Sequence, residues 1–153
     1  MLRILSHFSE SSFTLDPSRT YQEKELYNPT KPVGFWLSDE SDFGWSKWCT
    51  NENFSLHRLT CRQDFECDLS KWLVLSNTKA ILDFTEQYKM EELPSKYSFR
   101  FSHINWNKVK AEYGGILITP CDYSAQMDIR AFWYSNWDCA SACVWDLTTL
   151  RSL

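Results

Sequence analysis

Residues 34–49, GFWLSDESDFGWSKWC, place three tryptophans and a cysteine around an acidic, serine-containing turn. The stretch predicts a short strand over 33–38 that ends in Ser38, Asp39 and Glu40, whose side chains could cap a helix over roughly 41–49. An ordinary core element does not need so many indoles beside so much polarity. The mixture indicates a pocket that binds a flat ring.

The whole composition fits one folded domain over residues 1–153. Hydrophobic residues make up 43% of the chain and aromatics 16%, with eight tryptophans, which is well outside the range of disordered chains. Core packing accounts for most of these aromatics. The formal net charge of −4 gives no general attraction to nucleic acid, so a nucleic-acid partner would need a local basic patch.

The opening residues, MLRILSHFSE, contain too short an apolar run for a secretory signal. No stretch of the sequence approaches the ~18 apolar residues of a membrane span. We therefore expect a soluble cytoplasmic protein with no membrane partner. The six cysteines include no Cys-x-x-Cys pair, and His7 and His103 lie far from them in sequence, so we expect buried free thiols and no metal site.

The pattern of apolar residues predicts an α+β domain with short elements. After a long loop over 10–32, with one helical turn around 22–26, helical periodicity appears from Asn77 and again from Trp106, where Gly114 and Gly115 should end the helix. The expected strands cover 3–8, 33–38, 56–61, 72–76, 115–119, 129–134 and 142–147. The interleaving is too irregular for a β-α-β winding, and no glycine-rich phosphate loop is present.

Three stretches, taken in order, resemble the ADP-ribosyltransferase superfamily, on the side of diphtheria toxin and the poly-ADP-ribose polymerases. The first is His7-Phe8-Ser9, where the family has His followed two residues later by Ser or Thr. The second is GFWLSD over 34–39 with Trp48-Cys49, which is similar to the family's Gly-x-aromatic-x-small-Asp strand and its second aromatic. The third is YGGI over 113–116, followed by a final strand over 142–146.

The resemblance implies two small, mainly antiparallel sheets around a cleft that binds NAD as substrate. Trp36 and Trp48 would be the walls that hold the nicotinamide ring, and Trp45 would shape the helix that carries Trp48. His7 would bond a ribose hydroxyl, and Ser9 would support the carboxamide or the neighbouring loop. Arg19 could reach the pyrophosphate from the long loop. The expected NAD-binding residues are His7, Ser9, Arg19, Gly34, Trp36, Ser38 and Trp48.

The catalytic acid is where the sequence departs from the family. The polymerase-like members carry a glutamate at the start of the last strand, where this chain has Ser141. A serine cannot supply the charge that stabilises a developing cation. We expect Asp138, which lies just upstream between Trp137 and Cys139, to be the catalytic acid alongside His7. Glu112 is the next candidate.

The function implied by the resemblance is mono-ADP-ribosylation of a macromolecule, with protein favoured over nucleic acid as the acceptor. The small size suits a toxin or effector from a phage or bacterium, acting in a cell's cytoplasm and paired with an antitoxin or a host target. One alternative is an inactive module that binds NAD or another nucleotide with the same fold. Another is an aromatic-rich binder of carbohydrate or a nucleic-acid base, for which the acidic charge is no help. The related RNA 2′-phosphotransferases share the fold, but they need more clustered basic residues.

Overall fold

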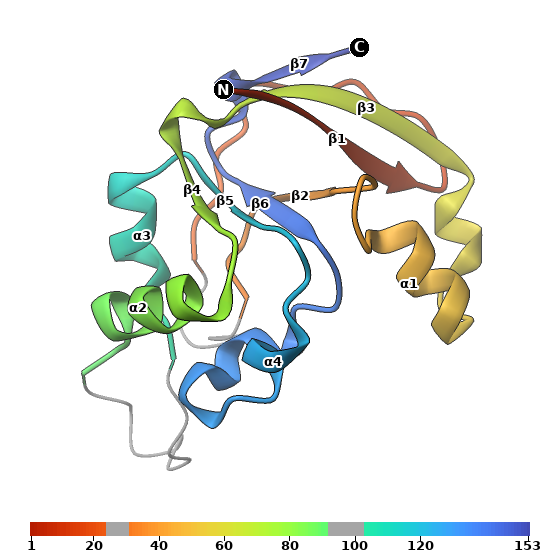
Figure 1. Cartoon of the computed structure of the whole chain (residues 1–153). Helices are drawn as coiled ribbons and strands as arrows, with labels where there is room; N and C mark the ends of the chain where they lie inside the picture. The colour runs from red at the N-terminus through yellow and green to blue at the C-terminus, as the bar shows by residue number, and fades with distance from the viewer. Residues whose placement is uncertain (24–30, 92–102) are drawn as a thin grey trace.

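A mixed sheet organises the computed structural model, which describes residues 1–23, 31–91 and 103–153. Its strands lie in the order β4-β5-β6-β2-β1-β3-β7 (Figure 1). The strands are β1 Leu2–Ser9, β2 Phe35–Ser38, β3 Cys61–Asp68, β4 Trp72–Leu75, β5 Gly115–Ile118, β6 Ser141–Val144 and β7 Leu150–Ser152. The α-helices are α1 Trp45–Glu52, α2 Thr78–Tyr88, α3 Trp106–Glu112 and α4 Tyr123–Gln126. Four 3₁₀ segments are η1 Leu56–Leu59, η2 Leu69–Lys71, η3 Ile129–Asn136 and η4 Leu147–Thr149.

The sheet has two halves that meet at one narrow junction. β4, β5, β6 and β2 form one half and β1, β3 and β7 form the other, and the only residues paired between β1 and β2 among those described are Ser6 and Ser38. β1 and β3, by contrast, pair over their full length, from Leu2↔Asp68 to Ser9↔Cys61. All pairings are antiparallel except β4 with β5. The α+β class and the mainly antiparallel pairing are confirmed, but hydrogen bonding links the strands into one sheet where two were expected.

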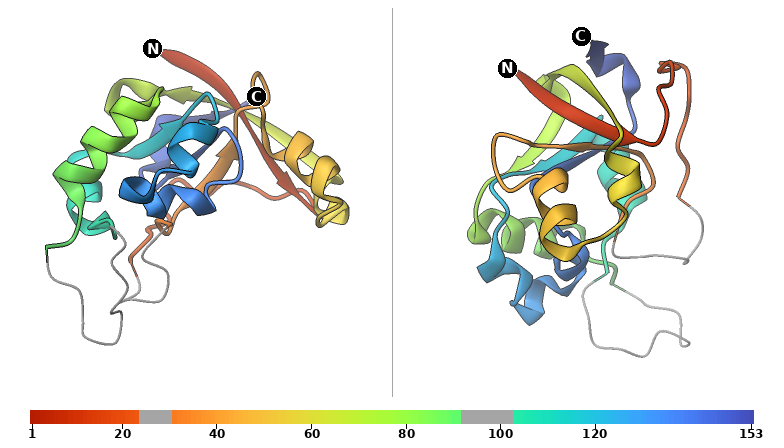
Figure 2. Two further views of the ribbon diagram at one scale, coloured as in Figure 1. Left: turned by 60° about the horizontal axis from the view of Figure 1, so that its bottom comes forward. Right: turned by 90° about the vertical axis from the view of Figure 1, so that its right-hand side faces the viewer.

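Two hydrophobic clusters stabilise the first half from its two faces. In β5, Ile116 and Ile118 belong to the cluster under α2, α3 and η3, whereas Leu117 belongs to the cluster shared with β1 and β3. All three side chains are fully buried, as the alternation of a strand covered on both faces requires. Helices α2 and α3 lie near β4, whereas β1 and β3 extend away toward α1 (Figures 1 and 2).

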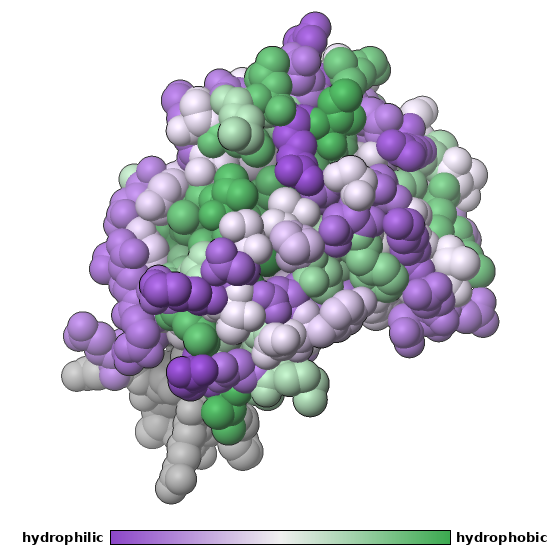
Figure 3. All heavy atoms as spheres, viewed as in Figure 1, coloured by the Kyte–Doolittle hydropathy of each residue, from purple (hydrophilic) through white to green (hydrophobic). Residues whose placement is uncertain are grey.

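Several hydrophobic side chains remain exposed on the strands. Leu2 and Ile4 on β1 and Val74 on the edge strand β4 are each more than two-fifths exposed. The space-filling view shows hydrophobic residues between the polar ones on the face seen in Figure 1 (Figure 3).

Within the described ranges, no helix is long and apolar enough to cross a membrane. All six cysteines are free thiols; Cys49, Cys67, Cys139 and Cys143 are buried, while Cys61 and Cys121 are partly exposed.

Asparagine side chains cap the starts of α2 and α3. Asn77 accepts a hydrogen bond from the Ala80 N–H at 2.8 Å at the start of α2, and Asn105 does the same for Lys108 in α3 at 3.1 Å. These caps satisfy N–H groups that the first turn leaves without intrahelical partners. Strands β1, β2, β4, β5 and β6 confirm five of the expected strands, with β6 ending at Val144 and not at Leu147.

Helix α1 starts later than expected, but the serine and glutamate ahead of it hold its first turn. Ser38 Oγ accepts from the Trp45 N–H at 2.7 Å and Glu40 Oε1 accepts from the Ser46 N–H at 3.3 Å. The polar turn therefore couples the end of β2 to the start of α1, which carries Trp45.

Two of the expected strands are wrong. Residues 56–59 form η1, and the strand begins only at Cys61; residues 129–136 form η3, in which the Asp128 side chain accepts from the Arg130 N–H. Glycine does not end α3 in a left-handed conformation either, because Tyr113 is the cap and no glycine has positive φ. The helical turn expected around 22–26 falls mostly outside the described residues.

Candidate functional site

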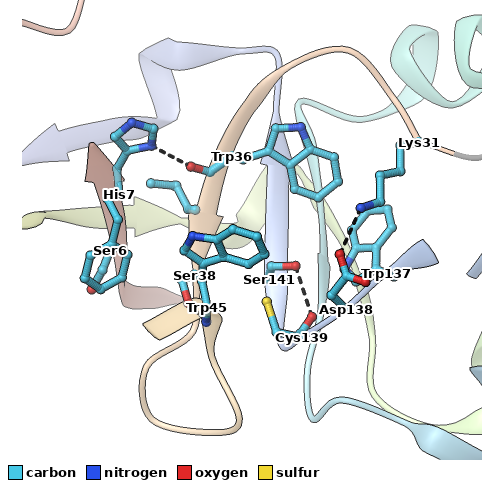
Figure 4. A pocket seen from close by; sticks show the side chains of 12 residues that line it. Ser6, His7, Lys31, Trp36, Ser38, Trp45, Trp137, Asp138, Cys139 and Ser141 are labelled. Carbon is cyan, nitrogen blue, oxygen red and sulfur yellow. Dashed lines mark hydrogen bonds and ion pairs between the residues drawn. The ribbon is translucent and has the colours of Figure 1, made fainter. Parts of the chain in front are cut away.

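A pocket of about 300 Å³ opens where the two halves of the sheet meet (Figure 4). This volume lies at the lower end of the range for small-ligand sites. β1, β2, α1 and the segment that leads into β6 all contribute to its wall. The lining residues are Ser6, His7, Phe8, Lys31, Trp36, Leu37, Ser38, Trp45, Trp137, Asp138, Cys139 and Ser141.

His7 is fixed at the junction by the neighbouring strand. Its Nδ1 lies 2.8 Å from the carbonyl oxygen of Trp36, and its ring stacks on Phe35 with centroids 4.6 Å apart. Because a carbonyl oxygen can only accept, Nδ1 must carry the proton, and Nε2 of the neutral ring is then an acceptor. Burial lowers the pKa of His7, and the bond to Trp36 only partly opposes this. The neutral ring therefore carries an acceptor at Nε2 at neutral pH, while the ring packs on Phe35 and Phe13.

Three indoles line the pocket. Trp36 comes from β2, Trp45 from α1 and Trp137 from the turn after η3. Trp36 and Trp137 pack with centroids 4.8 Å apart at 59°. The Nε1 of Trp137 is buried and has no hydrogen-bond partner among the described residues, so this donor is left unsatisfied.

Trp48, expected as the second wall, stands one layer behind the pocket. Its ring stacks on Trp45 with centroids 5.0 Å apart and an interplanar angle of 11°. Trp45, and not Trp48, is the α1 residue that lines the pocket. Stacked aromatic pairs add ~0.5–1.5 kcal/mol beyond burial. Trp48 therefore helps to hold the Trp45 ring in place but does not itself line the pocket.

Asp138 lines the pocket and is paired there. Its Oδ2 lies 3.3 Å from Lys31 Nζ, and each side chain is about one-third exposed. Asp138 carries the only carboxylate among the described residues of the lining. Ser141 lies beside it at the start of β6, where its hydroxyl donates to the Cys139 carbonyl at 3.1 Å. The one carboxylate of the described lining therefore stands three residues ahead of Ser141.

A buried cluster beneath the rim keeps the junction in place. Asp39 has no exposed surface and accepts hydrogen bonds from Arg3 at 2.5 Å, Thr119 at 2.6 Å and Ser41 at 2.6 Å. Burial alone would raise the pKa of Asp39, but these hydrogen bonds and the charge of Arg3 together lower it. The carboxylate ties β1 and β5 to the end of β2, immediately after Ser38.

Of the other expected site residues, Ser9, Arg19 and Glu112 lie outside the lining. The Ser9 hydroxyl donates to the Ser11 carbonyl at 2.7 Å beyond the pocket, and Arg19 lies over the Tyr21 ring. Ser38 is in the lining, but its hydroxyl already donates to Glu40 and accepts from Trp45. Glu112 borders a different hollow and accepts from the Tyr88 hydroxyl at 2.6 Å.

Gly34 has a packing role at the start of β2. A Cβ at this position would lie 2.5 Å from Cys143 Sγ and 2.8 Å from the Val144 carbonyl oxygen. We expect Gly34→Ala to destabilise the protein by about 1–3 kcal/mol, as over-packing commonly does, which urea unfolding will measure. Unchanged stability with reduced NAD affinity would contradict this role and favour direct contact with the cofactor.

The lowered pKa of His7 predicts a pH dependence of ligand binding. If NAD donates a hydroxyl to Nε2, as the resemblance implies, its affinity should be constant near neutral pH and fall about tenfold once the pH drops below the lowered pKa, because protonated Nε2 can no longer accept. The pKa of His7 in the folded protein lies below its ordinary value of 6.5. Conformational stability should therefore also fall as the pH drops from 6.5 toward the folded pKa. His7→Gln, which keeps an acceptor without titrating, should bind NAD with a flat profile; an equally steep profile in that variant would exclude His7.

Sequence reasoning did not assign Lys31 or Trp137 to the site. Lys31 precedes Pro32 in a loop without periodicity, and it reaches Asp138 across 107 positions of sequence. Trp137 lay in a stretch from which only Asp138 was singled out. The run of aromatic residues directly before Asp138 was the available sequence signal for Trp137. Nothing in the sequence marked Lys31.

Comparison with known proteins leaves the family of this chain unassigned. No family model, curated protein or solved structure matches it.

Proposed function

We propose that the pocket binds the nicotinamide end of NAD and that the protein transfers ADP-ribose to a macromolecular acceptor. One observation carries this proposal. His7, Trp36 and Asp138 are far apart in sequence but line one pocket. They supply an acceptor, an aromatic wall and a carboxylate, the three groups expected around the nicotinamide–ribose bond. The two halves of the sheet, joined at a narrow junction beside this pocket, are in turn proposed to correspond to the two sheets of the transferase fold.

The proposed reaction assigns each group a step. The bond between nicotinamide and ribose C1′ breaks, and its electron pair leaves with the ring, which becomes neutral nicotinamide. Positive charge then develops on the ribose, as in glycoside hydrolysis, and Asp138 stabilises it. The acceptor's nucleophile bonds to C1′ and loses a proton.

The proposal also assigns contacts in the ground state. Nε2 of His7 accepts from a ribose hydroxyl, and Trp36 stacks on the ring. Ser38 and Trp45 border the ring from the α1 side. Arg19, Ser9 and Gly34 are not assigned contacts with NAD in this arrangement.

An inactive NAD-binding module is the second candidate function. The observation favouring it is Ser141, which stands where the family has its glutamate, together with the Lys31 ion pair that engages Asp138. Such a module would bind NAD in the same pocket without releasing nicotinamide.

Transfer can be tested with NAD labelled in its adenylate half and incubated with the protein and cell lysates. Label that remains on macromolecules after gel filtration supports transfer. Loss of that label on protease treatment, but not on nuclease treatment, would identify a protein acceptor, which the net charge of −4 favours. Tight NAD binding without any labelled product would favour the inactive module.

A further inference from the structure

Lys31 places a cation inside the candidate pocket. Its Nζ lies 3.3 Å from Asp138 Oδ2 and 5.7 Å from the centroid of Trp36. Figure 4 shows the side chain directed at the Asp138 carboxylate beside the Trp137 ring. Its ammonium carries the only permanent positive charge among the described residues that line the pocket.

An aromatic face together with a carboxylate is the combination that recognises an organic cation. A cation within ~6 Å of an indole centroid gains ~0.5–1 kcal/mol at exposed sites, and a carboxylate adds Coulomb attraction. Trp36 and Asp138 offer both to the same point in space. The pocket therefore contains a cation subsite, and Lys31 fills it in the free protein.

We propose that Lys31 is a specificity-determining residue, an internal competitor that a cationic aromatic ring must displace. The competition rejects weakly bound neutral rings and admits an N-alkylpyridinium, which replaces the ammonium on both Trp36 and Asp138. The flexible four-carbon stem of lysine lets the ammonium leave without movement of the backbone. The inference rests on the proposed function in that the nicotinamide ring of NAD is such a cation.

The probe pair that isolates this effect is N-methylnicotinamide, methylated on the ring nitrogen, and nicotinamide. The first is a pyridinium cation and the second is neutral, and neither carries the phosphates through which a lysine could also bind NAD. Calorimetric titration of each into the folded protein gives two dissociation constants. Their ratio measures the selectivity of the pocket for the cation.

Lys31→Met removes the charge and keeps an apolar stem of similar length beside Trp36. Affinity for N-methylnicotinamide should rise about three- to tenfold, as expected when an exposed ion pair and a cation–π contact no longer compete. Affinity for nicotinamide should change less than twofold, by the same reasoning, because the occupied volume is similar. Lys31→Arg keeps the competing cation and should not raise affinity for either ring. Adding Asp138→Asn to Lys31→Met should remove most of the gain.

Three results would overturn the inference. The first is an equal change for both rings in Lys31→Met, which would mean a packing role. The second is weaker binding of the cation, which would mean that Lys31 contributes to binding. The third is no binding of either ring by folded wild type and folded Lys31→Met. Failure of the proposed transfer is distinguishable, because cation selectivity that rises in Lys31→Met stands even where NAD is never cleaved.

Discussion

Replacing Asp138 with Asn is expected to lower ADP-ribose transfer by about 10²-fold or more, by analogy with the loss of one preorganised electrostatic group. Asparagine keeps the shape and most hydrogen bonds but removes the charge that meets the developing cation. That interaction is stronger in the transition state than in the ground state, so the loss appears in turnover. Initial rates of nicotinamide release under saturating NAD measure it.

NAD affinity and melting temperature should barely change in Asp138→Asn. The substitution removes a partner of the pyridinium, but it also removes the ion pair that holds Lys31 in the pocket. Exposed ion pairs contribute only ~0–1 kcal/mol to stability. Asp146→Asn is the matched control, because Asp146 lies beyond the pocket and an Asn oxygen can still accept from Thr148. An Asp138→Asn variant as active as wild type would show that another group stabilises the cation.

Trp36→Ala should weaken NAD binding by about 1–3 kcal/mol, or roughly 5- to 150-fold. The indole forms the β2 wall of the pocket, packs on Trp137 at 4.8 Å and faces Lys31. Its removal takes away both the stacking surface and the cation–π contact. Titration of NAD into the variant measures the effect, with near-UV circular dichroism as a check on folding because a large truncation also costs stability.

Trp48→Ala provides a control of the same chemistry. Trp48 is absent from the pocket lining and supports Trp45 from behind, so we expect it to weaken NAD binding less than Trp36→Ala does. Equal NAD affinity in wild type and a folded Trp36→Ala variant would show that Trp36 serves packing alone. A larger effect at Trp48 than at Trp36 would contradict the assignment of the walls.

Elements with a clear period could be predicted from the sequence. In α2, Ile81, Phe84 and Tyr88 repeat at helical spacing after the Asn77 cap, and all three are buried. The apolar run from Trp72 forms β4. In these segments the local pattern and the tertiary packing require the same conformation, so the pattern was sufficient.

Segments whose conformation depends on distant partners could not be predicted. β3 reads CRQDFECD, which is too polar to suggest a strand, yet it is paired by β1 on one side and β7 on the other. The aromatic run from Ile129 resembles a strand, but Trp133 and Tyr134 are both buried in succession within η3. That burial pattern does not alternate, and the packing against α2 and α4 outweighs β propensity.

The residues of the candidate site also divide into those that local sequence could predict and those that it could not. His7, Trp36 and Asp138 were reached through short motifs and lie together, whereas the positions of Ser9, Arg19 and Trp48 outside the lining follow from the three-dimensional packing. Motif spacing cannot tell which of two stacked indoles faces the pocket, Trp45 or Trp48. Nor can it reveal that a loop lysine reaches Asp138.

Release of nicotinamide from NAD by the purified protein, with and without cell lysate, tests the central claim most directly. NAD labelled in the nicotinamide ring allows wild type and Asp138→Asn to be compared under the same conditions. We expect wild type to release nicotinamide about 10²-fold faster than Asp138→Asn does. No release by folded wild type with any lysate, or equal release by the two proteins, would contradict it.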